Sequence, residues 1–394
     1  MRFFRNLRHQ AREWTEQKIS KHSGGDQHQS PSDQSHGGPG GRQHNLQPNN
    51  LHFERYPIDT KGTKRELTED SIAGVEELGD VHSASSWIKR DLGFQGQIGN
   101  HVILSYGDTL YTDENGSDEF RGMTSDSIAL ATHDPLVVLD SDLNKYGYPN
   151  QGCPVVADYG ENMGEDALGI TNVVETEPRK GILYFLLNHR PGGINTIKGA
   201  GVATVTLTDT FPPRAKIERL AKHWWDGETE PWWGDVGAIR WKGYIYSYGH
   251  AKDSPFIYVA RVKWDEATKL EAYEYWNGQN WQKERPKTKE WGNDQRVFWM
   301  VNQGQVIYSN YFKCFLFVYS DNFWNSRVQV VTAPSPEGPF TTQPVLLYQA
   351  KPITEGSTTY AAVPHPYFDH SGKTLVVTFT NHPNTIQAVR VIFK

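Results

Sequence analysis

Five segments of the sequence share one pattern, in which an apolar, aromatic-rich stretch ends at a small cluster of polar residues. They are residues 101–109, 181–189, 243–250, 315–321 and 374–382. When the five segments are superposed, one position holds the residues that we call the slot residues: Asp108, His189, His250, Asp321 and His382. Carboxylates and imidazoles are the side chains that most often transfer protons. The repeat therefore gives one candidate catalytic or binding position in each unit.

A second carboxylate follows the first slot residue after a short loop. Asp126 stands at the start of the next expected strand, beyond the loop that spans residues 111–122. Because that strand begins where the preceding one ends, we expect Asp126 to face the same way as Asp108 and to lie beside it. Two converging carboxyl groups are what cleavage of a glycosidic bond requires, one as acid and the other as base or nucleophile.

A structural role or a metal site would also account for the slot residues. An Asp or His at the end of a strand commonly satisfies turn amides, and at any single position this structural role is the more common one. Five such residues in register favour a site, although repeated structural roles would produce the same register. Asp and His around a channel could also hold Ca²⁺ or a transition-metal ion. The spacing does not demand a metal, so we assign no metal ligand and no cofactor beyond such a channel ion.

Further polar and aromatic side chains are expected beside the slot residues. The starts of the innermost strands carry Asn172, Asp235, Asn302 and His365, and tryptophans stand in the loops at 224–225, 232–233 and 324. Indole rings stack on sugar faces, but they could equally cover the edge of a sheet. The residues that we predict to bind a carbohydrate substrate are His189, Asp235, His250, Asp321, Trp324, His365, His382 and Trp233.

The elements that carry these residues repeat along the chain. Successive slot residues lie roughly 60 to 80 residues apart, somewhat long for a propeller blade of four strands. Each repeat offers a strand, a turn signal such as Lys242-Gly243 or Ser371-Gly372, and two or three further strands. No long amphipathic helix interrupts the series. The sequence therefore predicts an all-β, five-bladed β-propeller over residues 94–394.

The residues before the repeats divide into two parts. Residues 1–50 combine a basic amphipathic stretch with a low-complexity stretch rich in Gly, Ser, Gln and His, which predicts a disordered N-terminal tail. Residues 51–93 form a lead-in with a short helix expected near 66–78. Since an early strand often completes the last blade of a propeller, we expect the lead-in to supply that ring-closing strand.

Bulk composition excludes several classes of function. The net charge is −6, and no cluster of Lys and Arg in the folded part predicts a nucleic-acid groove. The two cysteines, Cys153 and Cys314, lack metal-site spacing. The beginning of the chain has no apolar secretory stretch, and no segment has the length of a membrane span. We expect an intracellular protein, or a secreted one if the true start codon lies elsewhere.

Several short motifs resemble a propeller family known as domain of unknown function 4185, which includes the endo-D-arabinanases of glycoside hydrolase family 183. The motifs are Tyr106-Gly-Asp-Thr109 with the later Asp126, Trp233-Gly-Asp-Val-Gly237, Ala333-Pro-Ser-Pro-Glu-Gly-Pro-Phe340 and His365-Pro-Tyr-Phe368. The resemblance covers about residues 94–394. It implies a five-bladed propeller that hydrolyses furanoside linkages with an aspartate pair, which maps onto Asp108 and Asp126. We expect Asp126 to be the acid and Asp108 the base. We also expect an inverting route, because an open propeller cleft leaves room for a water molecule between the two carboxyl groups.

Three hypotheses of function remain open at this stage. The first is a glycoside hydrolase that acts on a D-arabinan-like or related glycan. The second is a propeller that binds carbohydrate, or serves as a scaffold, without catalysis. The third is an intracellular, metal-dependent lyase or small-molecule enzyme. The sequence itself names neither the substrate nor the stereochemical outcome.

Overall fold

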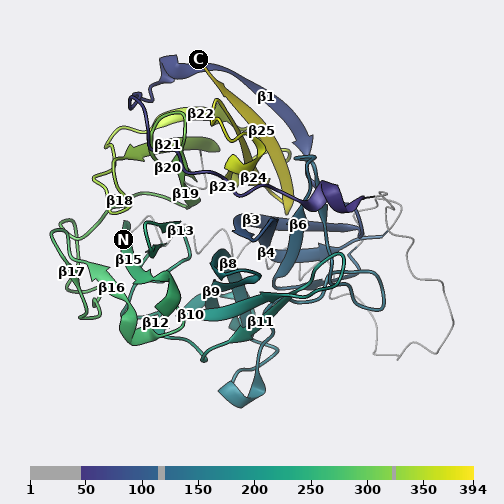
Figure 1. Ribbon diagram of the computed structural model, residues 1–394. Helices are drawn as coiled ribbons and strands as arrows, with labels where there is room; N and C mark the ends of the chain where they lie inside the picture. The colour runs from purple at the N-terminus through teal and green to yellow at the C-terminus, as the bar shows by residue number, and fades with distance from the viewer. Residues whose placement is uncertain (1–45, 114–119, 322–324) are drawn as a thin grey trace, which may run out of the picture.

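The computed structural model describes residues 46–113, 120–321 and 325–394. Within these ranges the chain forms strands and short 3₁₀ turns and no α-helix. Five sheets, antiparallel except for the β2–β7 pair, stand around a central axis (Figure 1). Their innermost strands are neighbours in the ring order β3, β8, β13, β19, β23 and back to β3. The prediction of an all-β, five-bladed propeller is confirmed.

Each sheet is one blade, whose first-named strand lies nearest the ring axis and whose later-named strands lie successively farther out. Blade 1 contains β3 (Ile88–Ile98), β4 (His101–Tyr111), β6 (Ser127–Ala131) and β7 (Val137–Leu139), with β5 (Gly122–Thr124) on β4 and β2 (His82–Ser83) on β7. Blade 2 contains β8 (Asp166–Glu177), β9 (Lys180–His189), β10 (Thr196–Leu207) and β11 (Ala215–Arg219), with β12 (Trp225–Asp226) on β10. Blade 3 contains β13 (Gly237–Trp241), β14 (Tyr244–Gly249), β15 (Phe256–Lys263), β16 (Glu274–Trp276) and β17 (Trp281–Gln282), with β18 (Phe298–Trp299) on β15. Blade 4 contains β19 (Gln303–Ser309), β20 (Cys314–Ser320), β21 (Arg327–Ala333) and β22 (Val345–Gln349). Blade 5 contains β23 (Thr359–His365), β24 (Thr374–Asn381), β25 (Thr385–Phe393) and β1 (Ile72–Asp80). The 3₁₀ turns are η1 (Pro48–Leu51), η2 (Glu69–Ser71), η3 (Ala157–Tyr159), η4 (Pro191–Gly193), η5 (Trp264–Glu266), η6 (Leu270–Ala272) and η7 (Pro366–Phe368).

Blade 5 is built from both ends of the described chain. β1 pairs antiparallel with β25, with Val75 opposite Val391, and becomes the outermost strand of that blade. Val75 packs against the apolar cluster between blades 4 and 5. The helix expected near residues 66–78 is therefore absent, because β25 offers this segment a ladder of hydrogen bonds and an apolar surface. A closed ring leaves no free edge between its first and last blades.

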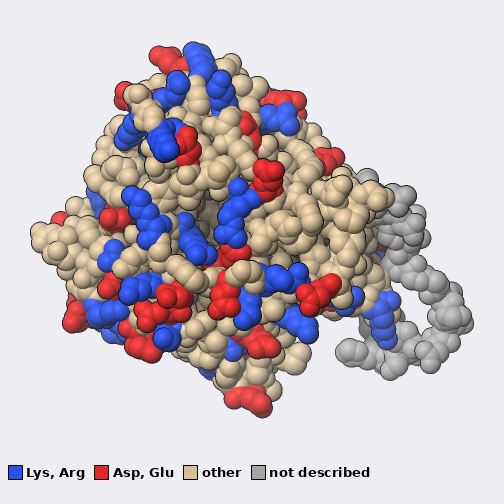
Figure 2. All heavy atoms as spheres, viewed as in Figure 1, with Lys and Arg blue, Asp and Glu red and all other residues tan. Residues whose placement is uncertain are grey.

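The segment before β1 crosses one end of the ring. Phe53 N donates to Asn100 O in blade 1 at 2.8 Å, and Asp59 N donates to Asn310 Oδ1 in blade 4 at 2.8 Å. In Figure 1 this segment runs in purple across the ring toward the start of β1. Figure 2 shows the same face, where Lys and Arg side chains gather around a central hollow.

The turns between the first and second strands of the blades, such as Lys242-Gly243, lie at this same end of the ring. The slot residues, at the ends of the second strands, therefore lie at the opposite end.

The hydrophobic core lies between neighbouring blades. Tyr248 of blade 3 and Phe317 of blade 4, for example, belong to one buried cluster, with ring centroids 6.0 Å apart. Strands that are buried on both faces explain the nearly continuous apolar runs that the sequence shows. None of the described residues forms a helix long and apolar enough to cross a membrane.

Candidate active site

The five slot residues occupy equivalent places in the five blades. His189 is the last residue of β9, and His250, Asp321 and His382 directly follow β14, β20 and β24. Asp108 lies near the end of β4. All five therefore stand at the end of the second strand of their blade, as the superposed segments suggested. Their surroundings, however, are not alike.

Three of the slot residues make a close polar contact with a charged residue of their own blade. His189 Nδ1 lies 2.7 Å from Asp166 Oδ1, His250 Nδ1 lies 2.8 Å from Asp235 Oδ2, and Arg327 Nη2 lies 2.7 Å from Asp321 Oδ2. The partners are Asp166 and Asp235 at the starts of inner strands and Arg327 at the start of a third strand. These pairs tie adjacent strands together at one end of each blade. In blades 2, 3 and 4 these contacts between strands therefore explain why a polar residue recurs at the slot position.

His250 has no ring nitrogen left for a ligand. Its Nδ1 faces Asp235, its Nε2 lies 2.8 Å from Val301 O, and its backbone N donates to Asp235 Oδ1 at 3.0 Å. Burial alone would lower the pKa of His250, but the charge of Asp235 and these hydrogen bonds raise it overall. His189, by contrast, holds Asp166 with Nδ1 only, and 27% of its side chain is exposed.

Asp108 is joined to two other blades. Its Oδ1 accepts a hydrogen bond from Arg190 Nη1 at 3.0 Å, and Arg190 directly follows His189 in blade 2. Its backbone carbonyl accepts from Asn384 Nδ2 of blade 5 at 2.9 Å. Since 34% of the Asp108 side chain is exposed, the carboxylate is open to a ligand while a guanidinium holds it in place.

Asp126 lies close enough to Asp108 for their charges to interact, and it is fully buried. Its Oδ1 accepts hydrogen bonds from the backbone N–H groups of Gly152 at 2.7 Å and Cys153 at 3.0 Å. Its Oδ2 has no hydrogen-bond partner among the described residues. Burial, with a smaller contribution from the charge of Asp108, raises the pKa of Asp126 to about 7.

A third carboxyl group, Asp91 on β3, was not identified from the sequence. Its Oδ2 accepts a hydrogen bond from Tyr360 Oη of blade 5 at 3.0 Å, whereas its Oδ1 is buried without a described partner. Burial, together with the charge of Asp108, raises the pKa of Asp91 to about 7. A Cβ atom on Gly107 would lie 2.4 Å from Asp91 Oδ1. The Gly beside Asp108 is thus needed to make room for Asp91.

Two irregular inner strands aim Asp91 and Tyr360 at one another. The pairing of β3 with β4 shifts on both sides of Leu92, which has a φ of +69°. The pairing of β23 with β24 shifts between Tyr360 and Val363, and Ala361 has a φ of +54°. Bulges of this kind redirect side chains and occur beside active sites, where backbone strain is retained for function. The two bulges therefore support a functional role for the Asp91–Tyr360 contact.

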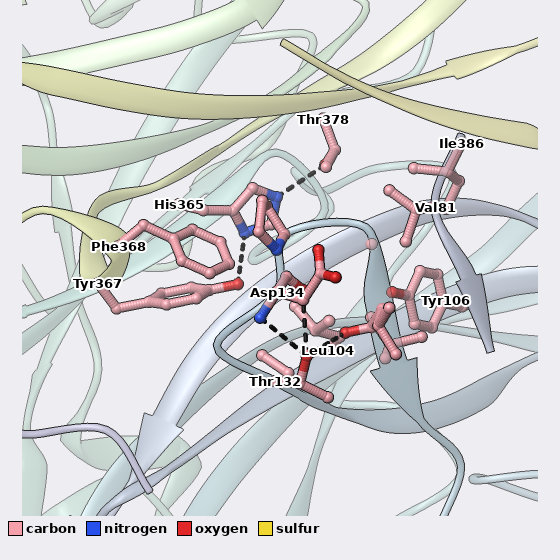
Figure 3. Close-up of a pocket in the computed structure, with 15 residues that line it drawn as sticks. Val81, Leu104, Tyr106, Thr132, Asp134, His365, Tyr367, Phe368, Thr378 and Ile386 are labelled. Carbon is pink, nitrogen blue, oxygen red and sulfur yellow. Dashed lines mark hydrogen bonds between the residues drawn. The ribbon is translucent and has the colours of Figure 1, made fainter. Parts of the chain in front are cut away.

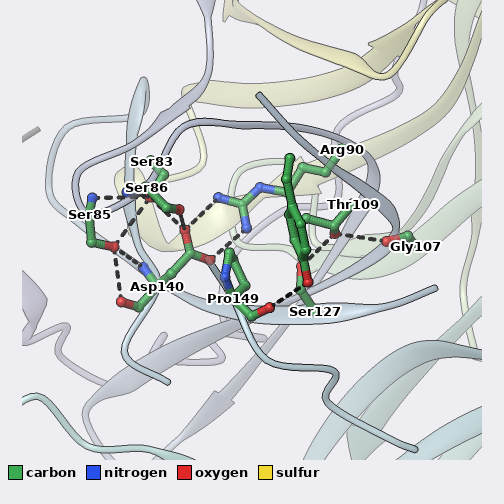
Figure 4. A network of polar contacts seen from close by, with 10 residues as sticks. Ser83, Ser85, Ser86, Arg90, Gly107, Thr109, Ser127, Asp140 and Pro149 are labelled. Carbon is green, nitrogen blue, oxygen red and sulfur yellow. Dashed lines mark hydrogen bonds and ion pairs between the residues drawn. The ribbon is translucent and has the colours of Figure 1, made fainter. Parts of the chain in front are cut away.

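A buried ion pair fixes β3 at Arg90, the residue that directly precedes Asp91. Arg90 Nη1 lies 2.8 Å from Asp140 Oδ1 (Figure 4). The Arg90 guanidinium also lies 4.0 Å from the centre of the Tyr106 ring. Asp140 Oδ2 also accepts hydrogen bonds from the hydroxyls of Ser83 and Ser86. Because every side chain in this network is buried and bonded, the backbone next to Asp91 is fixed before any ligand arrives.

His365 lies at the other end of its blade, so its predicted place beside the slot residues is wrong. The inner strand of blade 5 ends at His365, because Pro366 begins the turn η7 and cannot donate to a ladder. Its Nε2 lies 2.7 Å from Thr378 Oγ1 and its Nδ1 lies 3.0 Å from Tyr367 Oη (Figure 3). Burial lowers the pKa of His365 to about 3. It lines a cavity of about 20 Å³, which has room for one water molecule.

Of the remaining predicted residues that the structure describes, Trp233 adds no exposed aromatic surface to the site. Trp233 is fully buried beside Tyr275, with ring centroids 5.4 Å apart, so its predicted stacking on a ligand is wrong. Aromatic side chains fill the space between blades 2 and 3, which is why loop tryptophans can be hidden here. His382 is half-buried, and its N donates to Thr358 O. Trp324 lies outside the described residues.

The described residues do not include a group of three or more His, Cys, Asp or Glu side chains that could hold a metal ion. A channel Ca²⁺ or transition-metal ion therefore finds no such ligand set in the described part of the ring. Cys153 and Cys314 are both buried free thiols.

The candidate site contains three interacting carboxyl groups. Two of them have a pKa near 7, and the third faces an arginine. Pairs of titratable groups with separated pKa values are typical of acid–base catalysis.

The sequence of residues 141–393 matches the family model described as Domain of unknown function (DUF5005). The chain belongs to the DUF5005 family. The matched range of this DUF5005 chain covers blades 2 to 4 and most of blade 5, with His189, Arg190 and Tyr360, whereas Asp91, Asp108 and Asp126 precede it. No curated protein matches the sequence.

Solved structures share the fold of this DUF5005 chain at low sequence identity. A "putative hydrolase" from Bacteroides ovatus ATCC 8483 is 14% identical, with a TM-score of 0.57 over 79% of this chain and 86% of that one. A family 117 glycoside hydrolase of Zobellia galactanivorans is 13% identical, with a TM-score of 0.45 over 82% and 91%. The native arabinanase of Bacillus subtilis is 11% identical, with a TM-score of 0.41 over 78% and 95%. At these identities the similarity concerns the fold alone.

Proposed function

We propose that the protein is a glycoside hydrolase whose active site lies where blades 1, 2 and 5 meet. The observation that carries this proposal is the cluster of Asp91, Asp108 and Asp126, in which burial and mutual charge bring two pKa values to about 7. Glycosidic cleavage needs one carboxyl group that holds a proton at the working pH and one that stays charged. The hydrolase description of the Bacteroides ovatus protein agrees with this class of reaction.

Asp108 is the base in this proposal, because its carboxylate is partly exposed and faces Arg190 at 3.0 Å. The same guanidinium would stabilise the negative charge that a base must carry. The exposed edge of Asp108 lets it reach a water molecule beside the sugar ring. His189 ends β9 next to Arg190, and its Nε2 side is available to donate to a sugar hydroxyl.

Asp91 is a better candidate for the acid than Asp126, although the sequence favoured Asp126. Asp126 exposes no surface, and two backbone amides hold its Oδ1. Asp91 is half-buried as a residue, its Oδ2 accepts a hydrogen bond from Tyr360 Oη, and its raised pKa keeps much of its population protonated near pH 7. Asp126 would then act as a positioning residue, and its nearby carboxyl group would influence the charge of Asp108. The resemblance to domain of unknown function 4185 suggests a D-arabinan-like furanoside as substrate. An open cleft with room for a water molecule between the carboxyl groups favours inversion.

A panel of neutral polysaccharides that includes D-arabinan tests the proposal. The purified protein should release reducing ends from at least one polymer, and time-resolved proton NMR should show the inverted anomer first. Release of the retained anomer would overturn the inverting route alone. Binding of a polymer without any release of reducing ends would overturn the enzymatic proposal and favour a non-catalytic carbohydrate-binding propeller.

A further inference from the structure

A second concave site lies on the outer edge of blade 3. It is a groove of about 600 Å³ between the β16–β17 hairpin and the loop that follows β17. Its lining residues are Asn277, Gly278, Gln279, Gln282, Glu290, Trp291, Asp294 and Gln295. In Figure 1, β16 and β17 lie at the periphery of the ring, away from β4 and its Asp108. The groove is therefore separate from the candidate active site.

Hydrogen bonds and a close backbone contact shape this groove in advance. Asn277 Oδ1 accepts from the backbone N–H groups of Gln279 at 3.0 Å and Asn280 at 2.8 Å. Asn277 Nδ2 donates to Gln282 Oε1 at 3.0 Å. Gly278 has a φ of +95°, and a Cβ atom there would lie 2.1 Å from Asp294 O. The hairpin and the loop thus touch through their backbones, and the groove does not have to be ordered by a ligand.

Trp291 provides an aromatic wall of the groove. Its ring meets Tyr258 of β15 edge-on, with centroids 5.6 Å apart and an angle of 61° between the planes. Tyr258 Oη also lies 3.4 Å from Trp291 O. The indole is only half-buried, so part of it faces the groove. A supported, partly exposed indole is a suitable surface for the C–H face of a sugar ring.

Two exposed carboxylates complete the lining, Glu290 and Asp294. The nearby cations Arg285 and Lys287 are engaged with Glu230, at 2.7 Å and 3.8 Å. Within the described part of the chain, Glu290 and Asp294 form no salt bridge. Their oxygens are therefore available as acceptors for neighbouring hydroxyl groups, and their negative charge disfavours anionic ligands.

We propose that this groove binds a neutral glycan, as a second carbohydrate site on blade 3. The aromatic wall would receive the apolar face of a sugar ring, and the carboxylates and amides would receive its hydroxyls. Sugars that carry carboxylates, such as uronic acids, would be excluded by charge repulsion. The proposal does not depend on catalysis by Asp108.

Fluorine NMR of protein labelled with 5-fluorotryptophan tests this proposal at a single residue. The chain has 13 tryptophans, and the signal missing from Trp291→Phe identifies Trp291. Titration with xylotriose or arabinotriose should shift that signal, whereas trigalacturonate at the same millimolar concentration should not. In Glu290→Gln combined with Asp294→Asn, the apparent Kd should rise at least ten-fold. The matched control is Asp265→Asn, which removes an exposed carboxylate of blade 3 that lies outside the groove and should leave Kd unchanged.

The titration is repeated on Asp108→Asn to separate this proposal from the enzymatic one. A shift of the Trp291 signal that persists in Asp108→Asn supports an independent site, even if no polymer is cleaved. Absence of a shift with either neutral trisaccharide would overturn the proposal. An equal response to trigalacturonate would overturn the assignment to neutral glycans.

Discussion

Three aspartates at one end of the ring have the same side chain and three different environments. Asp108 is partly exposed beside Arg190, Asp126 is enclosed by backbone amides, and Asp91 lies under a tyrosine hydroxyl. Desolvation and the charge of a neighbour raise the pKa of a carboxyl group, whereas a guanidinium favours the charged form. These differences are what would allow one residue type to supply both an acid and a base.

The proposed acid predicts the alkaline side of the pH–rate profile. Asp91 has a pKa of about 7 and must be protonated to donate, so kcat/KM should fall as the pH rises above about 7. Asp91→Asn should lower kcat at least 100-fold on a substrate with a poor leaving group. A substrate with an activated leaving group needs no acid, so on it the variant should keep much of its rate and lose the alkaline decline. A variant profile that still falls above pH 7 on the activated substrate would contradict the assignment.

Asp126 should make the protein less stable as the pH rises. Its pKa is about 7 in the folded protein, above the 3.8 of an ordinary aspartate, so the folded state binds the proton more tightly than the unfolded chain does. The stability that this gives is fully present below pH 4 and is lost as the pH rises through 7. Asp126→Asn should therefore melt a few degrees higher than wild type at pH 8, with a smaller difference at pH 5. Equal differences at both pH values would contradict the raised pKa.

At the residue scale, the sequence identified Asp108 and Asp126 because both stand at recognisable strand boundaries. It missed Asp91, whose position depends on a bulge that has no short signature. The positions of Asp166 and Asp235 near the starts of inner strands could have pointed to Asp91, since all three lie in that part of their blade. Trp233 and His365 were misplaced because burial between blades and the end of β23 depend on packing that spacing does not reveal.

At the element scale, the close contact between Gly107 on β4 and Asp91 on β3 determines where the Asp91 carboxyl group lies. Gly107→Ala would bring a Cβ atom to 2.4 Å from Asp91 Oδ1, so Asp91 has to move. We expect kcat to fall at least ten-fold, with a decrease of only a few degrees in Tm. The matched control is Gly74→Ala on β1, where a Cβ atom meets no atom within 4 Å and both quantities should stay unchanged. Full activity in Gly107→Ala would show that the position of Asp91 does not limit the reaction.

At the scale of the whole molecule, the contact between β1 and β25 closes the ring. Glu76 and Arg390 lie opposite one another in this pair, with 2.6 Å between their charged groups and 314 positions between them in sequence. Glu76→Cys combined with Arg390→Cys should form a disulfide that raises Tm by several degrees under oxidising conditions, because the loop that it closes is long. The native thiols Cys153 and Cys314 are buried and should not compete. Equal Tm values with and without reductant, in a fully oxidised sample, would show that opening of this contact does not limit unfolding.

The overall architecture was predictable from sequence because the blades repeat one local pattern, and turn signals separate their strands. β1 was harder to assign, since its Glu-rich segment Val75-Glu-Glu-Leu-Gly79 pairs only with a strand some 300 residues away. Local periodicity cannot detect such a partner. The same limit explains why contacts between blades, such as Asp108–Arg190 and Asp91–Tyr360, emerged only from the structure.

Two slot aspartates provide the most direct measurement of the central claim. Asp108 faces the proposed active site, whereas Asp321 occupies the equivalent place in blade 4 and pairs with Arg327. On a polymer that wild type cleaves, Asp108→Asn should lose more than 99% of reducing-end release and keep its Tm within a few degrees. Asp321→Asn should lower Tm and keep activity per folded molecule. Retained activity in Asp108→Asn, or a loss of folding in that variant as large as in Asp321→Asn, would contradict a catalytic role for Asp108.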